Sequence, residues 1–427
     1  MPCLPRTVSQ LRRPGHHFLD SKLSRVSVSQ TSPRVLVAQI GARRRYAVPR
    51  GLAQAGCLQR VVTDACNAVR PWTYLRGVVP PWFRPRPLRA VLDRHIDGVT
   101  PDRIQGCVMF FLATRVGASR ARQGESKASF WVRQNEAFGR AVVGLDWGNA
   151  DTVYAFNGAA LEIFQRARAH GVRCVLDQTA APWRYNTQLL AREQARWPGW
   201  EKCPADMDPG GHMMAREEAE WELADQIVCG SPFVVEAIRS VGGPIEKCRV
   251  VPYPLPDIAP RLEHKPILRD RRLRVLFVGT LQLRKGIQYV WDTVGRLGDR
   301  DFECRAVGSS DLTPDAEKSV RSRLDWQGQV GRNDVWTHYA WADVFFLPTL
   351  SEGSANVCWE AAATRTRVVT TSAAGLVGWD ATIVPLESEA MAEQLLMLAR
   401  EPWQRSVIAP QPRSVAEYGA DLIRSMS

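Results

Sequence analysis

The sequence predicts an α/β protein built from two doubly wound domains, each with a parallel sheet. Its 427 residues exceed what a single hydrophobic core usually organises, and 45% hydrophobic residues are enough for two cores. Short apolar runs alternate along the chain with helical patterns. This alternation is typical of a parallel sheet that is covered by helices on both faces.

The first domain is predicted over residues 33–256. Its strands are expected at 34–40, 60–63, 106–112, 152–156, 173–176 and 226–229. Helical patterns at 158–169 and 213–223 lie between the later strands, as the crossovers of a parallel sheet require. The run PYPLP at 252–256 stiffens the chain and marks the boundary of the domain.

The second domain is predicted over residues 271–410, after a linker at 257–270. Its strands are expected at 275–278, 303–307, 344–347 and 368–371. The segment 411–427 follows two prolines and predicts a last helix at 414–426. In front of both domains, residues 1–32 are rich in Ser, Arg and Pro and have no sustained apolar run, which predicts a disordered basic tail.

The most informative motif closes the strand at 344–347 and reads LPTLSEGSANVCWEAAA. It predicts a strand, a tight loop at 351–354 and a helix at 355–363. The open N–H groups at the start of such a helix favour a diphosphate. Glu352 in the loop can accept a hydrogen bond from a sugar hydroxyl, and Glu360, expected two turns along, from a ribose hydroxyl. Two glutamates at this spacing also occur on solvated helix faces, so the pair alone leaves both interpretations open.

A second motif follows an earlier strand. Residues 274–280 form an apolar strand that ends at Gly279, and Arg284, Lys285 and Gly286 stand at the start of the next helical pattern. Arg284 offers a planar fork for two phosphate oxygens, and Lys285 offers a point charge. Cations oppose the helix dipole in a first turn, so their presence there indicates an anionic ligand.

The two motifs together, FVGTLQLRKG and EGSANVCWEA, resemble the donor half of family 4 retaining glycosyltransferases of the GT-B fold. The resemblance implies two Rossmann-like domains facing a central cleft, with a last helix that crosses back to the first domain. It implies that Arg284 and Lys285 hold the donor pyrophosphate and that Glu352 contacts the donor sugar, so these three are the catalytic candidates. The donor-binding candidates are Gly279, Gly353, Ser354, Ala355, Asn356 and Glu360.

The resemblance also implies a reaction that retains configuration and needs neither a metal ion nor a cofactor. The departing phosphate itself takes the acceptor's proton, so no protein nucleophile is expected. Arg284, Lys285 and helix N–H groups neutralise the diphosphate in place of a divalent ion. Asp206 and Asp208 mimic the D-x-D metal motif of a different glycosyltransferase fold, but they lie far from the donor motifs in the sequence and are interpreted as a chance match.

The chain departs from the family pattern at three places. Ser354 and Ala355 stand where many members have Phe-Gly, which alters the contacts of the loop with the sugar. Residues 364–367 replace the usual glycine and proline before the next strand, and the missing glycine removes an easy left-handed cap. The acceptor-side histidine of many relatives is absent, and Asn157 and Gly158 stand in the comparable stretch.

The acceptor side is predicted where the first strand ends. The position is the one at which GT-B enzymes often begin the acceptor cleft, and its positive charge suits an anionic acceptor such as a lipid-linked phosphate or an acidic sugar. The acceptor-side candidates are Gly41, Arg43, Arg44 and Gln178. Further cleft candidates, each with an ordinary structural interpretation as well, are Asn135, Trp183 and Glu193.

Charge and composition limit which partners and which cellular location fit the chain. The net charge is +12, and residues 1–50 contribute +9 of it, which suits anionic lipid, nucleic acid or a solvated tail without a partner. Residues 70–94 mix four aromatic residues with arginines, which is typical of a membrane interface, a site for a phosphate-bearing acceptor or an ordered surface loop. The ten cysteines are dispersed and no apolar run reaches the length of a spanning helix. The chain is therefore expected in the cytoplasm, with peripheral contact to the inner face of an anionic plasma membrane.

The function predicted is transfer of a sugar from a nucleotide-diphosphate donor, with UDP favoured, to a glycan or lipid-linked acceptor. A role in surface polysaccharide synthesis in bacteria is what the family implies. Two alternatives from other classes stay open: a GT-B nucleotide-sugar epimerase and a basic nucleic-acid-binding protein. The sequence shows no acid–base pair for the epimerase and no specific nucleic-acid motif for the binding protein.

Overall fold

The computed structural model describes residues 32–121, 127–201, 210–254, 272–298, 301–331, 333–378, 381–400 and 413–426. The predicted tail apart from its last residue, the predicted linker at 257–270 and the D-x-D at 206–208 lie outside the described residues. Within the described part, no helix combines the length and the apolar character that crossing a membrane requires.

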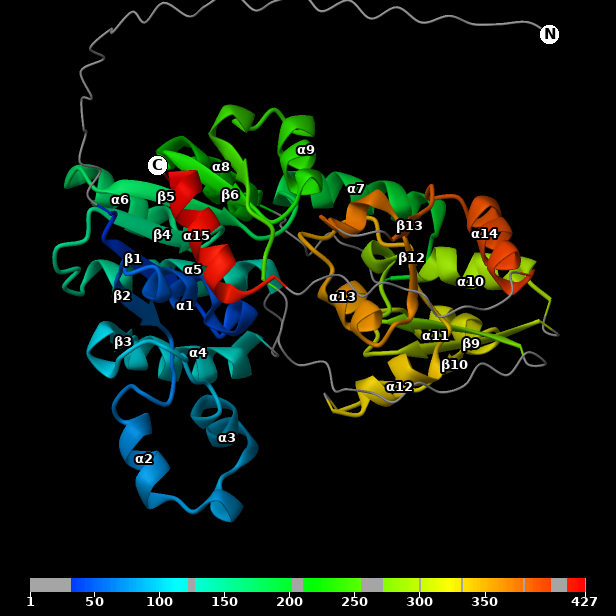
Figure 1. The fold of residues 1–427 in the computed structure, drawn as a ribbon, viewed down its shortest axis with the longest axis horizontal. Coiled ribbons are helices and arrows are strands. Elements are labelled where there is room, and N and C mark those ends of the chain that lie inside the picture. The colour runs from blue at the N-terminus through cyan, green and yellow to red at the C-terminus, as the bar shows by residue number, and fades with distance from the viewer. Residues whose placement is uncertain are drawn as a thin grey trace, which may run out of the picture. The chain divides into compact units, whose positions relative to one another are not determined.

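The first sheet has seven parallel strands among the described residues, in the order β3-β2-β1-β4-β5-β6-β7 (Figure 1). The strands are β1 Val35–Gln39, β2 Leu58–Thr63, β3 Ile104–Gly106, β4 Thr152–Phe156, β5 Arg173–Gln178, β6 Gln226–Cys229 and β7 Cys248–Val250. Every residue of β1 and β4 is buried, as expected for strands covered on both faces. The strand order reverses between β1 and β4, so a crevice opens beyond their carboxyl ends.

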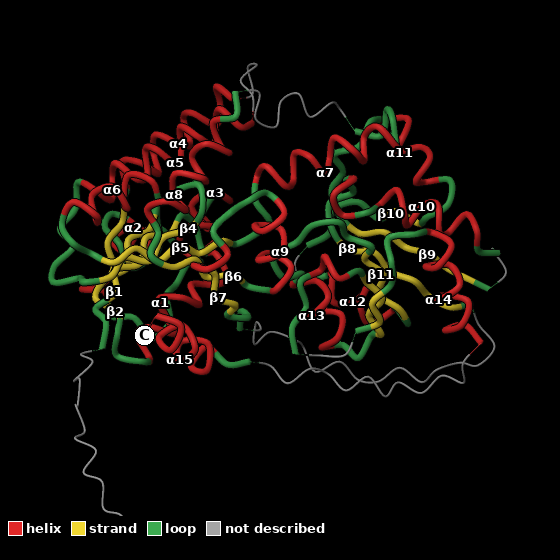
Figure 2. The backbone as a smooth tube through the Cα atoms, turned by 90° about the horizontal axis from the view of Figure 1, so that it is seen from above, coloured by secondary structure: helices red, strands yellow, loops and turns green. Residues whose placement is uncertain are grey.

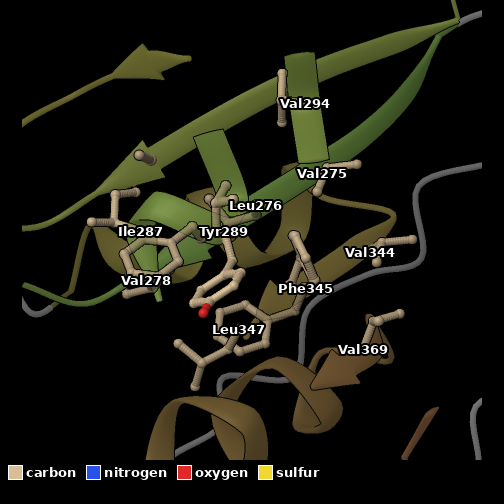
Figure 3. Close-up of a cluster of buried hydrophobic side chains, with 14 of the residues drawn as sticks. Val275, Leu276, Val278, Ile287, Tyr289, Val294, Val344, Phe345, Leu347 and Val369 are labelled. Carbon is tan, nitrogen blue, oxygen red and sulfur yellow. The ribbon is translucent and has the colours of Figure 1, made fainter. Parts of the chain in front are cut away.

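The second sheet has six parallel strands in the part that is described, in the order β10-β9-β8-β11-β12-β13. The strands are β8 Leu273–Val278, β9 Phe302–Val307, β10 Asp325–Trp326, β11 Val344–Leu347, β12 Arg367–Thr370 and β13 Thr382–Ile383. Figure 3 shows the core of this domain, where Val275 of β8, Phe345 of β11 and Val294 lie within one apolar cluster. The strand order reverses between β8 and β11, and the two predicted donor motifs follow these two strands.

Helices cover both faces of the sheets. In chain order they are α1 Ala47–Gln54, α2 Trp72–Val78, α3 Arg86–Leu92, α4 Val108–Ala121, α5 Lys127–Val143, α6 Leu161–Ala169, α7 Trp183–Arg196, α8 His212–Leu223, α9 Pro232–Ser240, α10 Ile287–Arg296, α11 Pro314–Arg321, α12 Val335–Trp341, α13 Asn356–Ala363, α14 Ser388–Arg400 and α15 Val415–Met426. Figure 2 shows α1 and α15 on one face of the first sheet, and α4, α5, α6 and α8 on the other. Two separate apolar clusters fill these two faces.

The last helix, α15, packs on the first domain rather than on the second. Tyr418, Leu422 and Met426 belong to the same buried cluster as β1 and α1. Gly419 lies so close to the backbone of Gly51 in α1 that a β-carbon on either glycine would overlap the other helix. Two glycines face to face thus let the two helices approach closely.

One predicted strand is wrong. The expected strand at 106–112 is divided, because β3 ends at Gly106 and α4 begins at Val108. The segment CVMFFLA is a continuous apolar run, and such a run has no periodicity that separates a buried strand from a buried helix. Three short strands, β7, β10 and β13, were not predicted, since two or three residues carry too little pattern.

The segment from α7 to Glu201 follows β5 in the chain and makes side-chain contacts with both domains. On the first domain, Arg184 forms an ion pair with Glu218 of α8, and Tyr185 packs edge-on against Phe233 of α9. Leu189 and Trp200 pack against the apolar cluster of the second sheet. The Glu193 carboxylate accepts hydrogen bonds from Gln288 Nε2 (3.0 Å) and Tyr289 Oη (3.2 Å). This segment therefore ties the two domains together well before the chain enters the second sheet.

Candidate donor and acceptor site

The two predicted donor motifs lie side by side in the structure. The 3-10 helix η6, Leu283–Lys285, follows β8, and its Arg284 carbonyl accepts hydrogen bonds from Leu350 N (2.9 Å) and Thr349 Oγ1 (3.2 Å). Gly286 adopts φ +79° directly against the carbonyl of Pro348, where a β-carbon has no room. Adjacency of β8 and β11 in the sheet thus brings together two segments that are far apart in the sequence.

Both predicted phosphate-binding cations converge on Glu352. Lys285 Nζ forms an ion pair with Glu352 Oε1, and Arg284 Nη1 lies 3.4 Å from the same oxygen. Arg284 Nη1 also donates to the carbonyl of Ser351 (2.5 Å). The Glu352 side chain is 14% exposed and that of Lys285 16% exposed, so solvent screens the three charges only weakly. The cluster carries one net positive charge and can exchange the carboxylate for an anionic ligand.

The loop between β11 and α13 presents fewer amide donors than the resemblance implies. The amides of Glu352 and Ala355 donate to the carbonyls of Ala373 (3.0 Å) and Ala374 (2.9 Å). The amide of Ala355, a predicted donor-binding residue, is therefore already satisfied by a neighbouring loop. In the described part of the chain, the amides of Gly353 and Ser354 donate to no protein acceptor, so these two remain for a ligand.

Glu360 has a partner that the sequence did not reveal. It is the fifth residue of α13, so it lies just over one turn into the helix, rather than two. Tyr339 of α12, which is fully buried, donates its hydroxyl to Glu360 Oε2 (3.0 Å). Burial and the adjacent carboxylate raise the pKa of Tyr339 well above its usual value, so the hydroxyl stays a donor. An aromatic residue in a helix gives no sequence signal for this role.

The donor loop also contacts the first domain. Gly353 lies against the carbonyl of Thr179, so close that a β-carbon would overlap it. The Gly353 carbonyl accepts a hydrogen bond from Ser231 Oγ (2.7 Å), and Ser351 Oγ donates to Asn186 Oδ1 (2.7 Å). The loop that carries Glu352 is therefore held from both domains.

A cavity of about 450 Å³ lies where these elements meet. Its lining residues are Arg43, Arg44, Trp131, Asn135, Asn157, Thr179, Ala180, Ala181, Trp183, Asn186, Met213, Arg284, Ser351, Glu352, Gly353 and Ser354. The lining includes four predicted donor-side residues, two predicted acceptor-side arginines and two of the further cleft candidates, Asn135 and Trp183. The predicted residues outside the lining are Gly41, Gln178, Glu193, Gly279, Lys285, Ala355, Asn356 and Glu360.

The turn after β1 is unusual, since three consecutive non-glycine residues are left-handed. Arg44, Arg45 and Tyr46 have φ of 48°, 52° and 59°. Each such residue costs roughly 1–2 kcal/mol relative to the right-handed conformation. The Gln39 side-chain amide braces the turn by donating to the carbonyls of Gly41 (2.9 Å) and Arg43 (3.2 Å), and the Tyr46 side chain is fully buried. The turn places Arg43 and Arg44 on the cavity wall.

Arg44 is engaged in a buried network beneath the cavity. Its guanidinium lies over the ring of Tyr253, 3.0 Å from the centroid. Tyr253 and Tyr154 each donate a hydroxyl to the fully buried carboxylate of Asp177 (both 2.7 Å). Burial raises the pKa of Asp177, while the two hydroxyls and the arginines oppose that rise. Arg44 thus supports the cavity floor and compensates the charge of Asp177.

Arg43 differs from its neighbour. Its Nη1 lies 3.4 Å from Thr179 Oγ1, and within the described residues it forms no ion pair. Thr179 in turn donates to Asn157 Oδ1 (2.9 Å), and Asn157 Nδ2 donates to the buried carboxylate of Glu217 (3.0 Å). Three residues at the carboxyl ends of β1, β4 and β5 therefore form one polar wall that carries a guanidinium group.

Two predicted acceptor-side residues do not line the cavity. Gln178 is fully buried, and its amide is taken up by Ala180, Glu217 and Trp221 rather than facing the cavity. Gly41 is a turn residue with φ +70°, whose amide donates to Asp64 Oδ1 (2.9 Å). A polar residue next to the end of a strand cannot be assigned to the cleft from sequence alone, because strand residues point alternately to opposite faces.

Comparison with known proteins agrees with this architecture. Residues 272–401 match the family model described as Glycosyl transferases group 1. The search of curated protein sequences gives no significant match. HepE of Anabaena, in a crystal structure with UDP and glucose, has a TM-score of 0.52 and 12% identity over 92% of this chain and 99% of its own. Sucrose-phosphate synthase from Thermosynechococcus elongatus has a TM-score of 0.54 and 15% identity, over 92% of this chain and 94% of its own.

A third similar structure is the lipopolysaccharide outer core galactosyltransferase WaaB in its apo form. Its TM-score is 0.52 and its identity 12%, over 92% of this chain and 98% of its own. Such low identities establish a shared fold. The chain therefore has the GT-B fold of two parallel-sheet α/β domains, and its second domain matches the group 1 glycosyl transferases.

Proposed function

We propose that the protein is a retaining glycosyltransferase that moves a sugar from a nucleotide-diphosphate donor to a glycan or lipid-linked acceptor. The observation that carries the proposal is the convergence of Arg284 and Lys285 on Glu352, beside the open amides of Gly353 and Ser354. Two cations and two amide donors around Glu352 match the charge and the acceptor oxygens of a diphosphate. UDP is the favoured nucleotide, by analogy with HepE, whose crystal structure holds UDP.

The donor occupies the wall formed by the second domain. The diphosphate replaces Glu352 as the partner of Lys285, and it takes the free donors of Arg284. Glu352 is then released to position a hydroxyl of the donor sugar. Glu360, oriented by the Tyr339 hydroxyl, accepts from the ribose. No divalent ion or cofactor is part of this proposal.

The reaction needs stabilisation of the leaving diphosphate more than it needs a nucleophile. Negative charge grows on the phosphates as the anomeric bond breaks, and Arg284 and Lys285 oppose that charge. Among the described residues that line the cavity, Glu352 is the single carboxylate, and it is paired with two cations. This arrangement supports same-face attack in which the departing phosphate takes the acceptor's proton.

The acceptor occupies the wall formed by the first domain. Arg43 forms no ion pair among the described residues, and its guanidinium on the cavity wall favours an acceptor with a phosphate or an acidic sugar. Trp131, which is 48% exposed on α5, offers a flat surface for a sugar ring. A cytoplasmic role in surface polysaccharide synthesis, with peripheral attachment to an anionic membrane, fits such an acceptor.

The same cavity disfavours the alternatives. An epimerase needs acid and base groups on both sides of the sugar carbon, and the described lining holds one carboxylate and no histidine. A nucleic-acid-binding role rests on the net charge, most of which lies in residues 1–50.

The proposal is tested by the release of nucleoside diphosphate from UDP-glucose, UDP-galactose and UDP-N-acetylglucosamine. We expect turnover with at least one donor, and we expect Lys285→Ala to lower it by two to three orders of magnitude, since a transition-state donor contributes roughly 3 to 4 kcal/mol. Lys318→Ala is the matched control, because Lys318 is exposed on α11. Near-normal turnover of Lys285→Ala would contradict the assignment, and an inverted anomeric configuration in the product would contradict retention.

A further inference from the structure

The crossover between β2 and β3 carries a separate small lobe. It consists of α2, the 3-10 helix η2 (Pro81–Phe83) and α3, and Figure 1 shows α2 and α3 apart from the helices that cover the sheet. Four large apolar side chains of this lobe face solvent: Tyr74 is 71% exposed, Val78 58%, Trp82 81% and Phe83 77%. Four large apolar side chains exposed within residues 74–83 indicate a binding surface, since single exposed residues are common but clusters are not.

The exposed apolar side chains belong to a lobe that is folded. Trp72, at the start of α2, is 8% exposed and packs edge-on against Phe111 of α4, with ring centroids 5.3 Å apart. Arg84 donates to the carbonyls of Val79 (2.9 Å) and Arg76 (2.9 Å), which joins α2 to the segment after η2. The lobe therefore turns one set of aromatic residues inward and holds another set outward.

The charge of the lobe is of one sign. From residue 65 to residue 92 the chain has five arginines and no Asp, Glu or Lys. Arg70, Arg76 and Arg89 are exposed. Tryptophan and tyrosine settle at the boundary of headgroups and acyl chains, and cations near an anionic leaflet are attracted to its surface charge. The lobe thus combines an apolar tip with a charge complementary to anionic lipid.

The base of the lobe is joined to the acceptor side of the cavity. Asp64, which directly follows β2, accepts hydrogen bonds from the amide of Gly41 (2.9 Å) and from Arg94 Nη1 (2.8 Å). Gly41 begins the turn that carries Arg43, and Arg94 follows α3. Because β1 and β2 are parallel neighbours, the lobe and the turn leave the sheet at the same edge.

We propose that this lobe is a docking surface for an anionic lipid bilayer, with Trp82 and Phe83 entering the interface and the arginines contacting lipid phosphates. Docking there brings the acceptor side of the cavity to a membrane-bound acceptor, a consequence that rests on the proposed function. The docking itself does not depend on the reaction.

The test is cosedimentation of the full chain with vesicles of phosphatidylcholine alone and of equimolar phosphatidylcholine and phosphatidylglycerol. We expect binding to the anionic vesicles, and a loss of roughly tenfold or more in the partition coefficient of Trp82→Ser/Phe83→Ser, because two aromatic side chains no longer bury apolar area. The double variant Arg76→Gln/Arg89→Gln should bind more weakly than the wild type. The difference should be larger at low salt than at high salt, because salt screens the charges. Met397→Ser is the control, since Met397 is 57% exposed on α14 of the second domain.

Each outcome decides the proposal. Thermal stabilisation by UDP is measured on the same variants to show that they are folded. If UDP stabilises neither the wild type nor any variant, the result counts against the donor site and not against docking. If Trp82→Ser/Phe83→Ser binds as tightly as the wild type, or if a chain starting at residue 32 no longer binds, the lobe is not the docking surface. Absence of vesicle binding in the wild type overturns the proposal, as does oligonucleotide binding that is lost in the same double variant.

Discussion

At the residue scale, Arg365 replaces a glycine and still forms a left-handed cap. It has φ +58° directly after α13, and its amide donates to Ala362 O (2.9 Å), while Thr366 N donates to Ala361 O (3.1 Å). The expectation that the missing glycine removes this cap is therefore wrong, because the hydrogen bonds at the helix end hold the cap in a conformation that arginine adopts at a cost.

The left-handed conformation of this cap predicts that glycine at position 365 is more stabilising than alanine. Arg365→Gly is expected to have a higher free energy of unfolding than Arg365→Ala by about 1 kcal/mol, since both lack the side chain but glycine alone is unstrained at this φ. Chemical denaturation of the two variants measures the difference. Equal stabilities would show that the left-handed cap is not populated.

The site residues show what sequence can and cannot specify. The cations and glutamates of the two donor motifs could be predicted, because short loops after strands β8 and β11 fix their places within a sheet. The brace from Tyr339 and the occupied amide of Ala355 depend on contacts with α12 and with the loop after β12, which leave no pattern near the motif. The burial of Gln178 likewise depends on contacts with Glu217 and Trp221 of α8, which lie far from it in the sequence.

At the element scale, α8 supplies a buried cap for α6. Glu220 accepts hydrogen bonds from the amides of Gly158 (2.6 Å), Ala160 (2.8 Å) and Leu161 (3.2 Å) at the start of α6. Burial raises the pKa of Glu220 to about 8, although these amides and Arg216 act in the opposite direction. Burial also raises the pKa of Glu217, the carboxylate that holds Asn157 and Gln178.

These carboxyl groups predict a decrease of stability with pH. Below about pH 4.5 Glu220 is protonated in both states, and between there and about pH 8 the unfolded chain binds fewer protons at this residue than the folded one. The raised pKa of Glu217 acts in the same direction. The free energy of unfolding should thus fall by up to about 1.4 kcal/mol per pH unit for one such group. Glu220→Gln should reduce that slope, whereas Glu389→Gln, at an exposed position of α14, should not. A wild-type stability that rises from pH 5 to pH 8 would contradict the shift.

The predicted bounds of an element are accurate where its hydrophobic periodicity and its length indicate the same type of element. Strands β4 and β6 and helix α8 lie within one residue of their predicted bounds, since alternating strands and helices have clear turns between them. The expected strand at 106–112 is wrong and the short strands were not predicted, because the hydrophobic pattern alone does not identify such segments.

At the scale of the whole molecule, the cavity depends on contacts that join the two domains. Asn186 and Glu193 of α7 bind Ser351, Gln288 and Tyr289 of the second domain, and Ser231 binds the Gly353 carbonyl. Trp197 and Trp200 pack with Trp291, with ring centroids 6.2 and 5.5 Å from that of Trp291. A ligand that touches the Glu352 loop therefore contacts a structure to which both domains contribute, so its binding should stabilise the whole fold.

The most direct test of the donor site is thermal stabilisation by UDP, GDP and ADP, compared between the wild type, Glu360→Ala and the control Glu389→Ala. A ligand that binds only the native state raises apparent stability by mass action, by about 2.7 kcal/mol at a hundredfold excess over its dissociation constant. We expect stabilisation by UDP in the wild type and in Glu389→Ala, and its loss in Glu360→Ala. Stabilisation by none of the three nucleotides, or equal stabilisation of Glu360→Ala, would contradict it.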